Sequence, residues 1–158
     1  MTEEDFVSRV TAMRRQLYHV ARTMLYREED AADAVQEAML RAWSRLPALR
    51  DEGQFEAWFF RIFVSRCRDA QRRQIREKQG LKAVADLPPI LREEDGRDVR
   101  MALMELPEAL RLPTVLHYIE GYTLRETAQI LALTPEQVNS RVRQARRRMK
   151  DLLSEGGI

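Results

Sequence analysis

The stretch TLRETAQILALTPEQVNSRVRQARRRMK, residues 123–150, decides how the rest of the chain is interpreted, because it contains two helix starts. Thr123 is followed three residues later by Glu126, and Thr134 is followed in the same way by Gln137, which is the spacing of a capping box. Pro135 stands at the first helical position, where a missing N–H is tolerated. The stretch therefore predicts two helices in immediate succession.

Both predicted helices have an apolar side. On the first, Leu124, Ala128 and Leu131 share a face, and the turn to the second helix lies at Ala132 and Leu133. The second helix has an apolar stripe that consists of Val138, Val142, Ala145, Met149, Leu152 and Leu153. Its other sides carry amide, hydroxyl and cationic groups, namely Asn139, Ser140, Arg143, Gln144, Arg146, Arg147 and Lys150.

This arrangement fits a helix-turn-helix whose second helix enters the major groove of DNA. In that motif Asn, Gln, Ser and Arg near the helix start read base edges, while Arg and Lys around it hold phosphates. An ordinary amphipathic helical hairpin with a solvated basic face has the same pattern. The two helices alone leave both interpretations open.

The charge of the chain is balanced overall but clustered locally. The 158 residues are 44% apolar and 33% charged, with a formal net charge of only +2, so affinity for nucleic acid must come from clusters of positive charge. Two such clusters exist. One consists of Arg66, Arg68, Arg72, Arg73, Arg76 and Lys78, and the other of Arg141, Arg143, Arg146, Arg147, Arg148 and Lys150.

Residue usage argues against several classes of protein. The single cysteine, Cys67, excludes an intramolecular disulfide framework, and with His19 and His117 it makes no metal-ligand spacing. We therefore expect no metal and no cofactor, and an enzyme is the least favoured class. No apolar run is long enough to cross a bilayer, and the acidic N-terminus lacks the basic start of a signal peptide, which predicts a cytoplasmic protein.

Helical spacing of apolar residues predicts three helices in the first half, over residues 5–26, 28–46 and 54–78. The second begins with an acidic run that complements the helix dipole, and Pro47 ends it. A mixed polar strip runs along this helix, and periodicity alone favours a solvated face for it. The strip consists of Asp33, Gln36, Glu37, Leu40 and Arg41.

The third predicted helix begins with more aromatic surface than one side of a helix usually hides. Its rings belong to Phe55, Trp58, Phe59, Phe60 and Phe63, and arginines follow them closely. Rings beside cations are the ingredients of a surface for single-stranded nucleic acid, where bases stack while cations follow the backbone. The helical spacing of the rings favours packing in a core instead, and some of them must be core.

The second half of the chain begins after a change of character. Residues 80–97, with Pro88 and Pro89, are predicted to be a linker. After it, Val99, Ala102, Leu103 and Leu106 form a short apolar stripe. Pro113 is predicted to break or begin the next helix, Val115, Leu116 and Ile119 to be buried, and Gly121 to end that helix in the left-handed conformation.

No strand-like alternation is convincing, so the predicted fold is all-α. We expect two small helical domains, a three-helix unit at residues 1–79 and a helix-turn-helix unit at residues 98–158, joined by the linker.

Two separate stretches resemble one family in the same order. Residues 33–43, DAVQEAMLRAW, followed by Phe55, Trp58, Arg61, Ile62, Asp69, Arg72 and Arg73, resemble region 2 of the extracytoplasmic-function (ECF) sigma factors of bacterial RNA polymerase. A second set of residues resembles region 4 of the same family. It consists of Leu106-Pro107-Glu108, Arg111, Glu120-Gly121, Glu126, Ala128, Leu131, Val138, Ser140-Arg141 and Ala145-Arg146. The resemblance covers nearly the whole chain.

The resemblance implies an alternative sigma factor that directs core RNA polymerase to promoters and assists promoter melting. It also changes the interpretation of the polar strip, which by this resemblance is a surface that contacts the clamp helices of the largest polymerase subunit. The segment from Leu49 to Phe55 matches the loop that captures an unstacked base of the minus-10 element. The implied minus-10 residues are Leu49, Arg50, Phe55, Trp58, Arg61, Arg66, Arg68, Arg72 and Arg73.

In region 4 the resemblance implies contacts with the minus-35 element. The base-facing positions are Asn139, Ser140, Arg143 and Gln144, and phosphate contacts are expected from Arg125, Arg141, Arg146 and Arg147. The chain departs from the family where Ala132 replaces the usual Gly of the turn and Glu136-Gln137 replaces Gly-Thr. Asn139 and Gln144 also stand where Lys or Arg is frequent in the family.

The family commonly has an anti-sigma inhibitor, which makes such a protein an expected partner. Two other readings remain open on the residues alone. One is a conventional helix-turn-helix transcriptional regulator, and the other is a sigma-like adaptor without promoter-melting activity.

Overall fold

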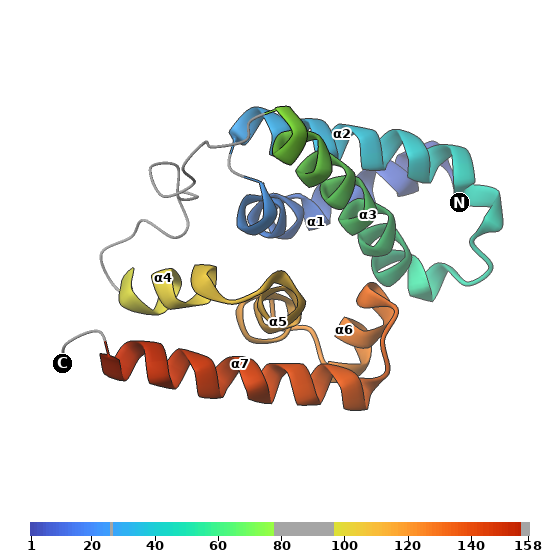
Figure 1. The fold of residues 1–158 in the computed structure, drawn as a ribbon. Coiled ribbons are helices and arrows are strands. Elements are labelled where there is room, and N and C mark those ends of the chain that lie inside the picture. Colours follow the sequence, from blue (N-terminus) through green and yellow to red (C-terminus); the bar gives the residue numbers. More distant parts are fainter. Residues whose placement is uncertain (26, 78–96, 156–158) are drawn as a thin grey trace. The chain divides into compact units, whose positions relative to one another are not determined.

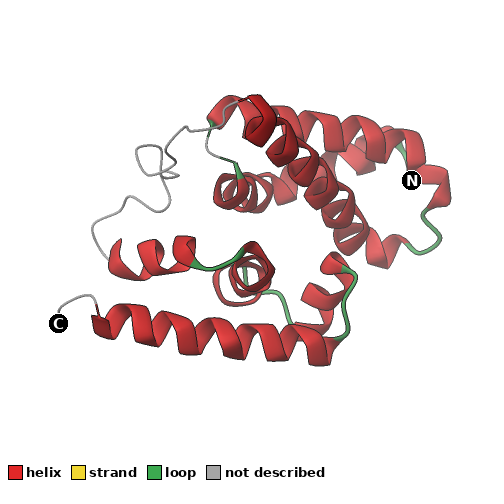
Figure 2. Cartoon of the chain, viewed as in Figure 1, coloured by secondary structure: helices red, strands yellow, loops and turns green. Residues whose placement is uncertain are grey.

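A computed structural model describes residues 1–25, 27–77 and 97–155 of the chain. Its regular elements within these ranges are all helical, which confirms the predicted all-α class (Figure 2). The chain divides into two compact units, Met1–Ala83 and Val84–Ile158. The predicted linker at residues 80–97 falls on residues outside the described ranges except for Arg97, which is the first residue of a helix.

The first unit is a bundle of α1 (Glu3–Met24), α2 (Glu28–Arg45) and α3 (Phe55–Glu77), each packed against the other two (Figure 1). These bounds lie within two residues of the predicted ones. The start of α1 is a capping box that the sequence analysis missed, in which the backbone N–H of Asp5 donates to Thr2 Oγ1 at 3.1 Å. Two short 3₁₀ turns, η1 (Leu46–Ala48) and η2 (Glu52–Gln54), lie in the loop between α2 and α3.

The core of the first unit is aromatic. Phe55, Phe59, Phe60 and Phe63 are at most 1% exposed, and the ring of Phe6 on α1 meets that of Phe55 edge-on at 5.8 Å between centroids. The core interpretation of the aromatic rings is therefore confirmed for these four. Because α3 packs on both α1 and α2, it is covered over a wider arc than a helix with one neighbour.

The connection from α1 to α2 is held by polar contacts with α3. Gln71 Nε2 donates to the carbonyl oxygen of Met24 at 3.1 Å, and Gln74 Nε2 donates to Asp30. Nearby, desolvation raises the pKa of the Tyr18 phenol, and Glu28 raises it further by its charge and by a hydrogen bond. These contacts orient the start of α2 against the other two helices.

The second unit is organised around its last helix, α7 (Pro135–Glu155). Against it pack α4 (Arg97–Glu105), α5 (Glu108–Thr114) and α6 (Leu124–Leu131), as Figure 1 shows. Arg111 joins α4 to α5, because its Nη1 donates to the carbonyl oxygens of Met104 at 3.3 Å and of Leu106 at 3.1 Å. Leu103, Leu106, Leu110 and Leu116 are buried inside this unit.

The path through Pro113 differs from the prediction. Pro113 neither breaks nor begins a helix but lies inside α5, and the chain continues directly into a π-helical turn, η5 (Val115–Ile119). There the N–H of Glu120 donates to Val115 five residues back, at 3.0 Å. Because a π-helical turn holds more residues than an α-helical one, the 3.6-residue spacing used for the prediction does not apply across it.

Two residues that the sequence placed on apolar stripes are in fact exposed. Ile119 is 49% exposed, in keeping with its place at the end of the π-helical turn, and Val99 is 47% exposed on the first turn of α4. Val115 and Leu116 are buried as predicted, and Gly121 has the predicted left-handed conformation with φ of +81°.

Candidate nucleic-acid and partner interfaces

Both helix starts of the helix-turn-helix are capping boxes, as predicted. The N–H of Glu126 donates to Thr123 Oγ1 at 3.0 Å, and the N–H of Thr123 donates to Glu126 Oε1 at 2.9 Å. At the next helix the corresponding distances between Thr134 and Gln137 are 3.1 and 2.9 Å. Each box satisfies two backbone N–H groups, so both helices start at defined residues.

The turn between α6 and α7 is made without glycine. Ala132 takes φ of 57° and ψ of 45°, the left-handed conformation, and the N–H of Leu133 donates to the carbonyl oxygen of Ala128 at 2.9 Å. A small core of Ala128, Val138 and Val142, with Leu124 and Leu133 packed against it, holds the two helices together. On α6 the buried apolar residues are Ala128 and Ile130, whereas Leu131, predicted to face the core, is only half-buried.

One side of α7 is buried and the others meet solvent. Val138, Val142 and Ala145 are at most 4% exposed, so the apolar stripe is confirmed at these positions. The candidate minus-35 residues lie away from it: Ser140, Arg143, Gln144, Arg146 and Arg147 are exposed, Asn139 and Arg141 are half-buried, and Arg125 is exposed on α6. These amide, hydroxyl and guanidinium groups have the chemistry needed to read base edges and hold phosphates.

Arg146 has a partner within its own unit. Its guanidinium carbon lies 5.3 Å from the centroid of the Tyr118 ring, and a guanidinium N–H donates to the phenol oxygen. Tyr118, on η5, is 50% exposed. The sequence analysis assigned no role to Tyr118, because nothing in its spacing connects it with a residue 28 positions further along the chain.

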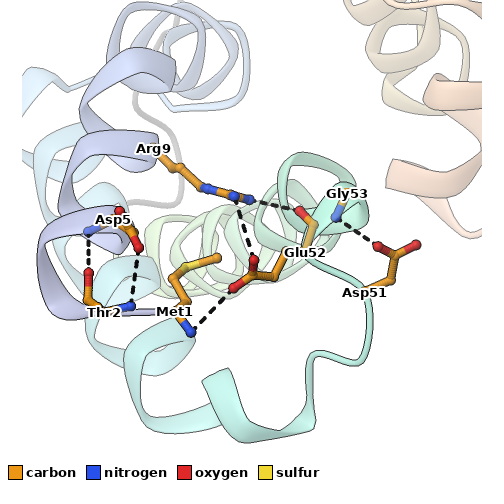
Figure 3. Close-up of polar contacts among 7 residues, drawn as sticks. All are labelled: Met1, Thr2, Asp5, Arg9, Asp51, Glu52 and Gly53. Carbon is orange, nitrogen blue, oxygen red and sulfur yellow. Dashed lines mark hydrogen bonds and ion pairs between the residues drawn. The ribbon is translucent and has the colours of Figure 1, made fainter.

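The loop from Leu49 to Phe55 leads into α3, and contacts from α1 hold it (Figure 3). Arg9 Nη1 donates to the carbonyl oxygen of Glu52 at 2.8 Å, and the Glu52 carboxylate lies 3.3 Å from the amino group of Met1. Within the loop, the N–H of Gly53 donates to Asp51 Oδ1 at 2.9 Å. The loop therefore has a defined conformation at η2.

The candidate minus-10 residues do not all lie at the surface. Arg50 is exposed and Leu49 is half-buried, but Phe55 is 1% exposed between Phe6 and Phe59. The placement of Phe55 at a DNA surface is therefore corrected: its ring belongs to the core. Trp58, which is half-buried, remains partly accessible.

Several arginines of the basic face of α3 pair with carboxylates. Asp69 accepts ion pairs from Arg66 at 2.8 Å and from Arg72 at 3.0 Å, and Arg73 lies 3.7 Å from Glu37 on α2. Arg61 and Arg68 are exposed. The sequence analysis missed the pairs with Asp69, although both have the i,i+3 spacing that places side chains together on a helix.

The polar strip of α2 meets solvent. Asp33 and Gln36 are exposed, and Glu37 and Arg41 are half-buried. Leu40 is 71% exposed, which makes it the most exposed of the large apolar side chains described. The strip is therefore accessible to solvent, as a surface for another protein must be.

The described part of the chain contains no group of three or more His, Cys, Asp or Glu residues able to hold a metal ion. Among the described helices, none combines the length and the apolar character needed to cross a membrane.

Comparisons with known proteins match both units. Residues 9–77 match the family model for sigma-70 region 2, and residues 96–149 match that for sigma-70 region 4. The ECF RNA polymerase sigma factor SigM of Mycobacterium tuberculosis strain H37Rv is 34% identical over 143 residues, an alignment that covers 88% of this chain and 72% of SigM. The ECF RNA polymerase sigma-E factor of Escherichia coli K12 is 28% identical over 134 residues, an alignment that covers 74% of this chain and 70% of the sigma-E factor.

Solved structures have the same fold. A structure of CnrH in complex with the cytosolic domain of CnrY matches with a TM-score of 0.77 and 26% identity, covering 99% of this chain and 92% of CnrH. The sigma factor RpoE of Bartonella quintana, crystallised with the anti-sigma factor NepR, matches with a TM-score of 0.73 and 21% identity. The match covers 96% of this chain and 98% of RpoE.

A three-helix unit followed by a helix-turn-helix unit, each matched to its own sigma-70 region, defines a bipartite DNA-binding protein of the transcription machinery. The chain belongs to the ECF sigma factors of the sigma-70 family. It is an alternative sigma factor, which directs RNA polymerase to promoters and so acts in the initiation of transcription.

Proposed function

We propose that the two units divide promoter recognition between them. The helix-turn-helix unit, residues 98–158, reads the minus-35 element as duplex DNA, and the three-helix unit, residues 1–79, binds core polymerase and the minus-10 element. The observation that carries this proposal is the geometry of α7. Its apolar stripe is buried at Val138, Val142 and Ala145, while Ser140, Arg143 and Gln144 are exposed.

In the minus-35 contact, Arg143 and Gln144 are the main base-reading residues. A bidentate pair between a side chain and a base edge discriminates by about 1 to 3 kcal/mol. Asn139 and Ser140, one turn nearer the start of α7, complete the base-facing group. Phosphate contacts come from Arg125, Arg141, Arg146 and Arg147, which hold the helix in register without reading sequence.

In the minus-10 contact, the loop from Leu49 to Phe55 takes an extruded base of the non-template strand. Extrusion costs on the order of a few kcal/mol, which stacking and pocket contacts offset. Exposed Arg50, half-buried Leu49 and half-buried Trp58 are the groups available to the base. Arg61, Arg66, Arg68, Arg72 and Arg73 guide the phosphates, and Phe55 contributes through its place in the core.

The polymerase contact lies on α2. Leu40, at 71% exposure, supplies apolar area, and Asp33, Gln36, Glu37 and Arg41 surround it with polar groups. An apolar centre with a polar rim is the usual anatomy of a protein interface. The clamp helices of the largest polymerase subunit are the proposed partner. Because this partner is in the bacterial cytoplasm, the protein functions there, as a specificity subunit with no catalytic chemistry or cofactor of its own.

An anti-sigma factor is a further proposed partner. The support is the likeness to CnrH, whose structure was solved in complex with the cytosolic domain of CnrY. Binding of such a protein to either DNA-binding unit would block promoter recognition.

Run-off transcription tests the proposed function most directly. Core polymerase, the purified chain and a promoter library are combined, and the selected transcripts report partner, activity and sequence preference together. A conventional helix-turn-helix regulator would bind promoter DNA but support no transcript with core enzyme alone. A sigma-like adaptor would bind polymerase but leave the minus-10 region unmelted.

A further inference from the structure

The loop from Leu49 to Phe55 is attached to a helix that lies far from it in the sequence. Arg9, on α1, is 43 residues away from Glu52, yet its Nη1 donates to the Glu52 carbonyl oxygen at 2.8 Å (Figure 3). Its Nη2 lies 4.0 Å from the Glu52 carboxylate. The guanidinium carbon is 5.6 Å from the centroid of the Phe55 ring, at the end of the loop.

These contacts differ in how firmly they hold the loop. The ion pair with the Glu52 carboxylate is at the limit of ion-pair distance and joins side chains that are 40% and 56% exposed, so water and salt weaken it. The bond to the carbonyl oxygen is short, has a charged donor and acts on the backbone itself. It therefore fixes the path of the chain, whatever the Glu52 side chain does.

The aromatic ring beneath the Arg9 guanidinium is part of the core. Phe55 is buried, and it packs against Phe6, which precedes Arg9 by three residues and so shares its side of α1. One face of α1 thus meets the loop twice, through Phe6 at the end of the loop and through Arg9 at η2. A guanidinium group suits this place because its planar fork can stack on a ring while it donates to an oxygen.

We infer that Arg9 is a positioning residue for minus-10 recognition, which holds the Leu49–Phe55 loop in the conformation that accepts the extruded base. This inference rests on the proposed role of the loop. Arg9 acts through the backbone at Glu52 and contacts no DNA. Without it, the loop has more conformations to lose when the base enters, and base capture is weaker while other DNA contacts are unchanged.

The test measures how strongly melting depends on the captured base. Full-length protein and core polymerase are mixed with a promoter that carries a fluorescent base analogue at the melting site. The rate of opening is compared with the rates on promoters that have an abasic site at each non-template position of the minus-10 element in turn. The largest ratio of the intact rate to an abasic rate is the base-discrimination ratio.

For Arg9→Ala the base-discrimination ratio should fall about three- to tenfold, the effect of losing one hydrogen bond of typical net strength, because the Arg9 side chain is partly exposed to water. Arg14→Ala is the matched control, because it removes an exposed arginine from the same helix and should leave the ratio unchanged. Binding of the minus-35 duplex should be the same in all variants. If Arg9→Ala fails to fold, Arg9→Met keeps the apolar stem of the side chain and should show the same fall.

One result would overturn the inference, namely an unchanged base-discrimination ratio in the folded Arg9 variant. If opening is then also slower by the same factor on intact and abasic promoters, the role of Arg9 is merely structural. The proposed role of the loop fails separately: if the wild-type protein itself shows no dependence on any minus-10 base, the loop captures none. The comparison of wild type with the variant therefore distinguishes the two failures.

Discussion

The guanidinium of Arg146 lies over the ring of Tyr118, with 5.3 Å between the guanidinium carbon and the ring centroid, and donates a hydrogen bond to the phenol oxygen. This contact connects η5 to the exposed side of α7. A free arginine side chain samples many rotamers, and contact with a ring restricts them. Tyr118 therefore restricts the Arg146 side chain, and we expect this restriction to favour the proposed phosphate contact.

The first prediction concerns this pair. Tyr118→Ala should weaken binding of the minus-35 duplex about two- to fivefold, because an exposed cation–π contact contributes about 0.5 to 1 kcal/mol. Tyr118→Phe, which keeps the ring and loses the hydroxyl, should lie between wild type and Tyr118→Ala. Fluorescence anisotropy with a labelled duplex measures both. Ile119→Ala, at the neighbouring exposed residue, is the control. Tighter binding by Tyr118→Ala would show instead that the ring withholds Arg146 from DNA.

The second prediction separates base reading from phosphate binding on α7. Arg143→Ala or Gln144→Ala should lower affinity for the promoter by about 1 to 3 kcal/mol and affinity for scrambled DNA by less. Arg147→Ala, which removes an exposed arginine of the same helix that is assigned to a phosphate, should weaken binding of both duplexes alike and lower the slope of the salt dependence by about one phosphate contact. Titrations of the promoter duplex and the scrambled duplex at several salt concentrations measure both affinities and their salt dependence. Equal losses on the two sequences would remove Arg143 and Gln144 from base reading.

The third prediction concerns the proposed polymerase surface. Leu40→Asp should weaken association with core polymerase at least about tenfold, since burial of an exposed leucine contributes about 1.5 to 3 kcal/mol and a buried carboxylate adds a penalty. The unfolding temperature should change little because the side chain is 71% exposed. A labelled-protein titration with core enzyme measures the affinity.

The matched control for Leu40→Asp is Val7→Asp, at a 46% exposed apolar residue of α1. Asp33→Lys offers a second probe of the same strip, and it is preferable to Glu37→Lys, which would also break the ion pair with Arg73. Full polymerase affinity in both Leu40→Asp and Asp33→Lys would place the interface elsewhere.

The fourth prediction concerns the turn of the helix-turn-helix. Ala132 has φ of 57°, a conformation that costs an alanine about 1 to 2 kcal/mol. Ala132→Gly removes this strain but makes the unfolded chain more flexible by about 0.4 to 1 kcal/mol, so a net gain in stability of about 1 kcal/mol or less is expected. Thermal or urea unfolding followed by circular dichroism detects it.

Gly121 provides the converse experiment. Its φ is +81°, and a Cβ there would meet no atom within 4 Å, so Gly121→Ala adds backbone strain without a steric clash. It should destabilise the second unit by about 1 kcal/mol. A loss of stability in Ala132→Gly together with a gain in Gly121→Ala would contradict the assigned backbone conformations.

Local chemistry explains why much of the fold was predictable. The boxes at Thr123 and Thr134 each involve groups three residues apart, so their partners are present in any chain that forms the helix. The bounds of the first three helices were predicted from the helical spacing of apolar residues, with Pro47 marking the end of α2. The prediction at Pro113 was wrong because it considered only the local preference of proline to break a helix. In the structure Pro113 lies inside α5, which packs against α7.

The surface assignments were less predictable. Nothing in the spacing of Phe55, Phe59, Phe60 and Phe63 shows that two helices cover α3, so the same rings fit a nucleic-acid surface and a core. Ile119 is exposed at the end of a π-helical turn, and no single residue of that turn indicates in the sequence that the turn is π-helical. The role of Tyr118 depends on an arginine from a different helix.

The amino-acid sequence by itself determined the all-helical class, the capped starts of α6 and α7 and the apolar stripe of α7, because each depends on groups within a turn or two of one another. Only the tertiary structure decided which aromatic rings are buried, which arginines are paired, and that Arg9 holds the loop at Glu52. Those contacts join segments tens of residues apart, and they exist only after the packing of apolar side chains has brought the helices together.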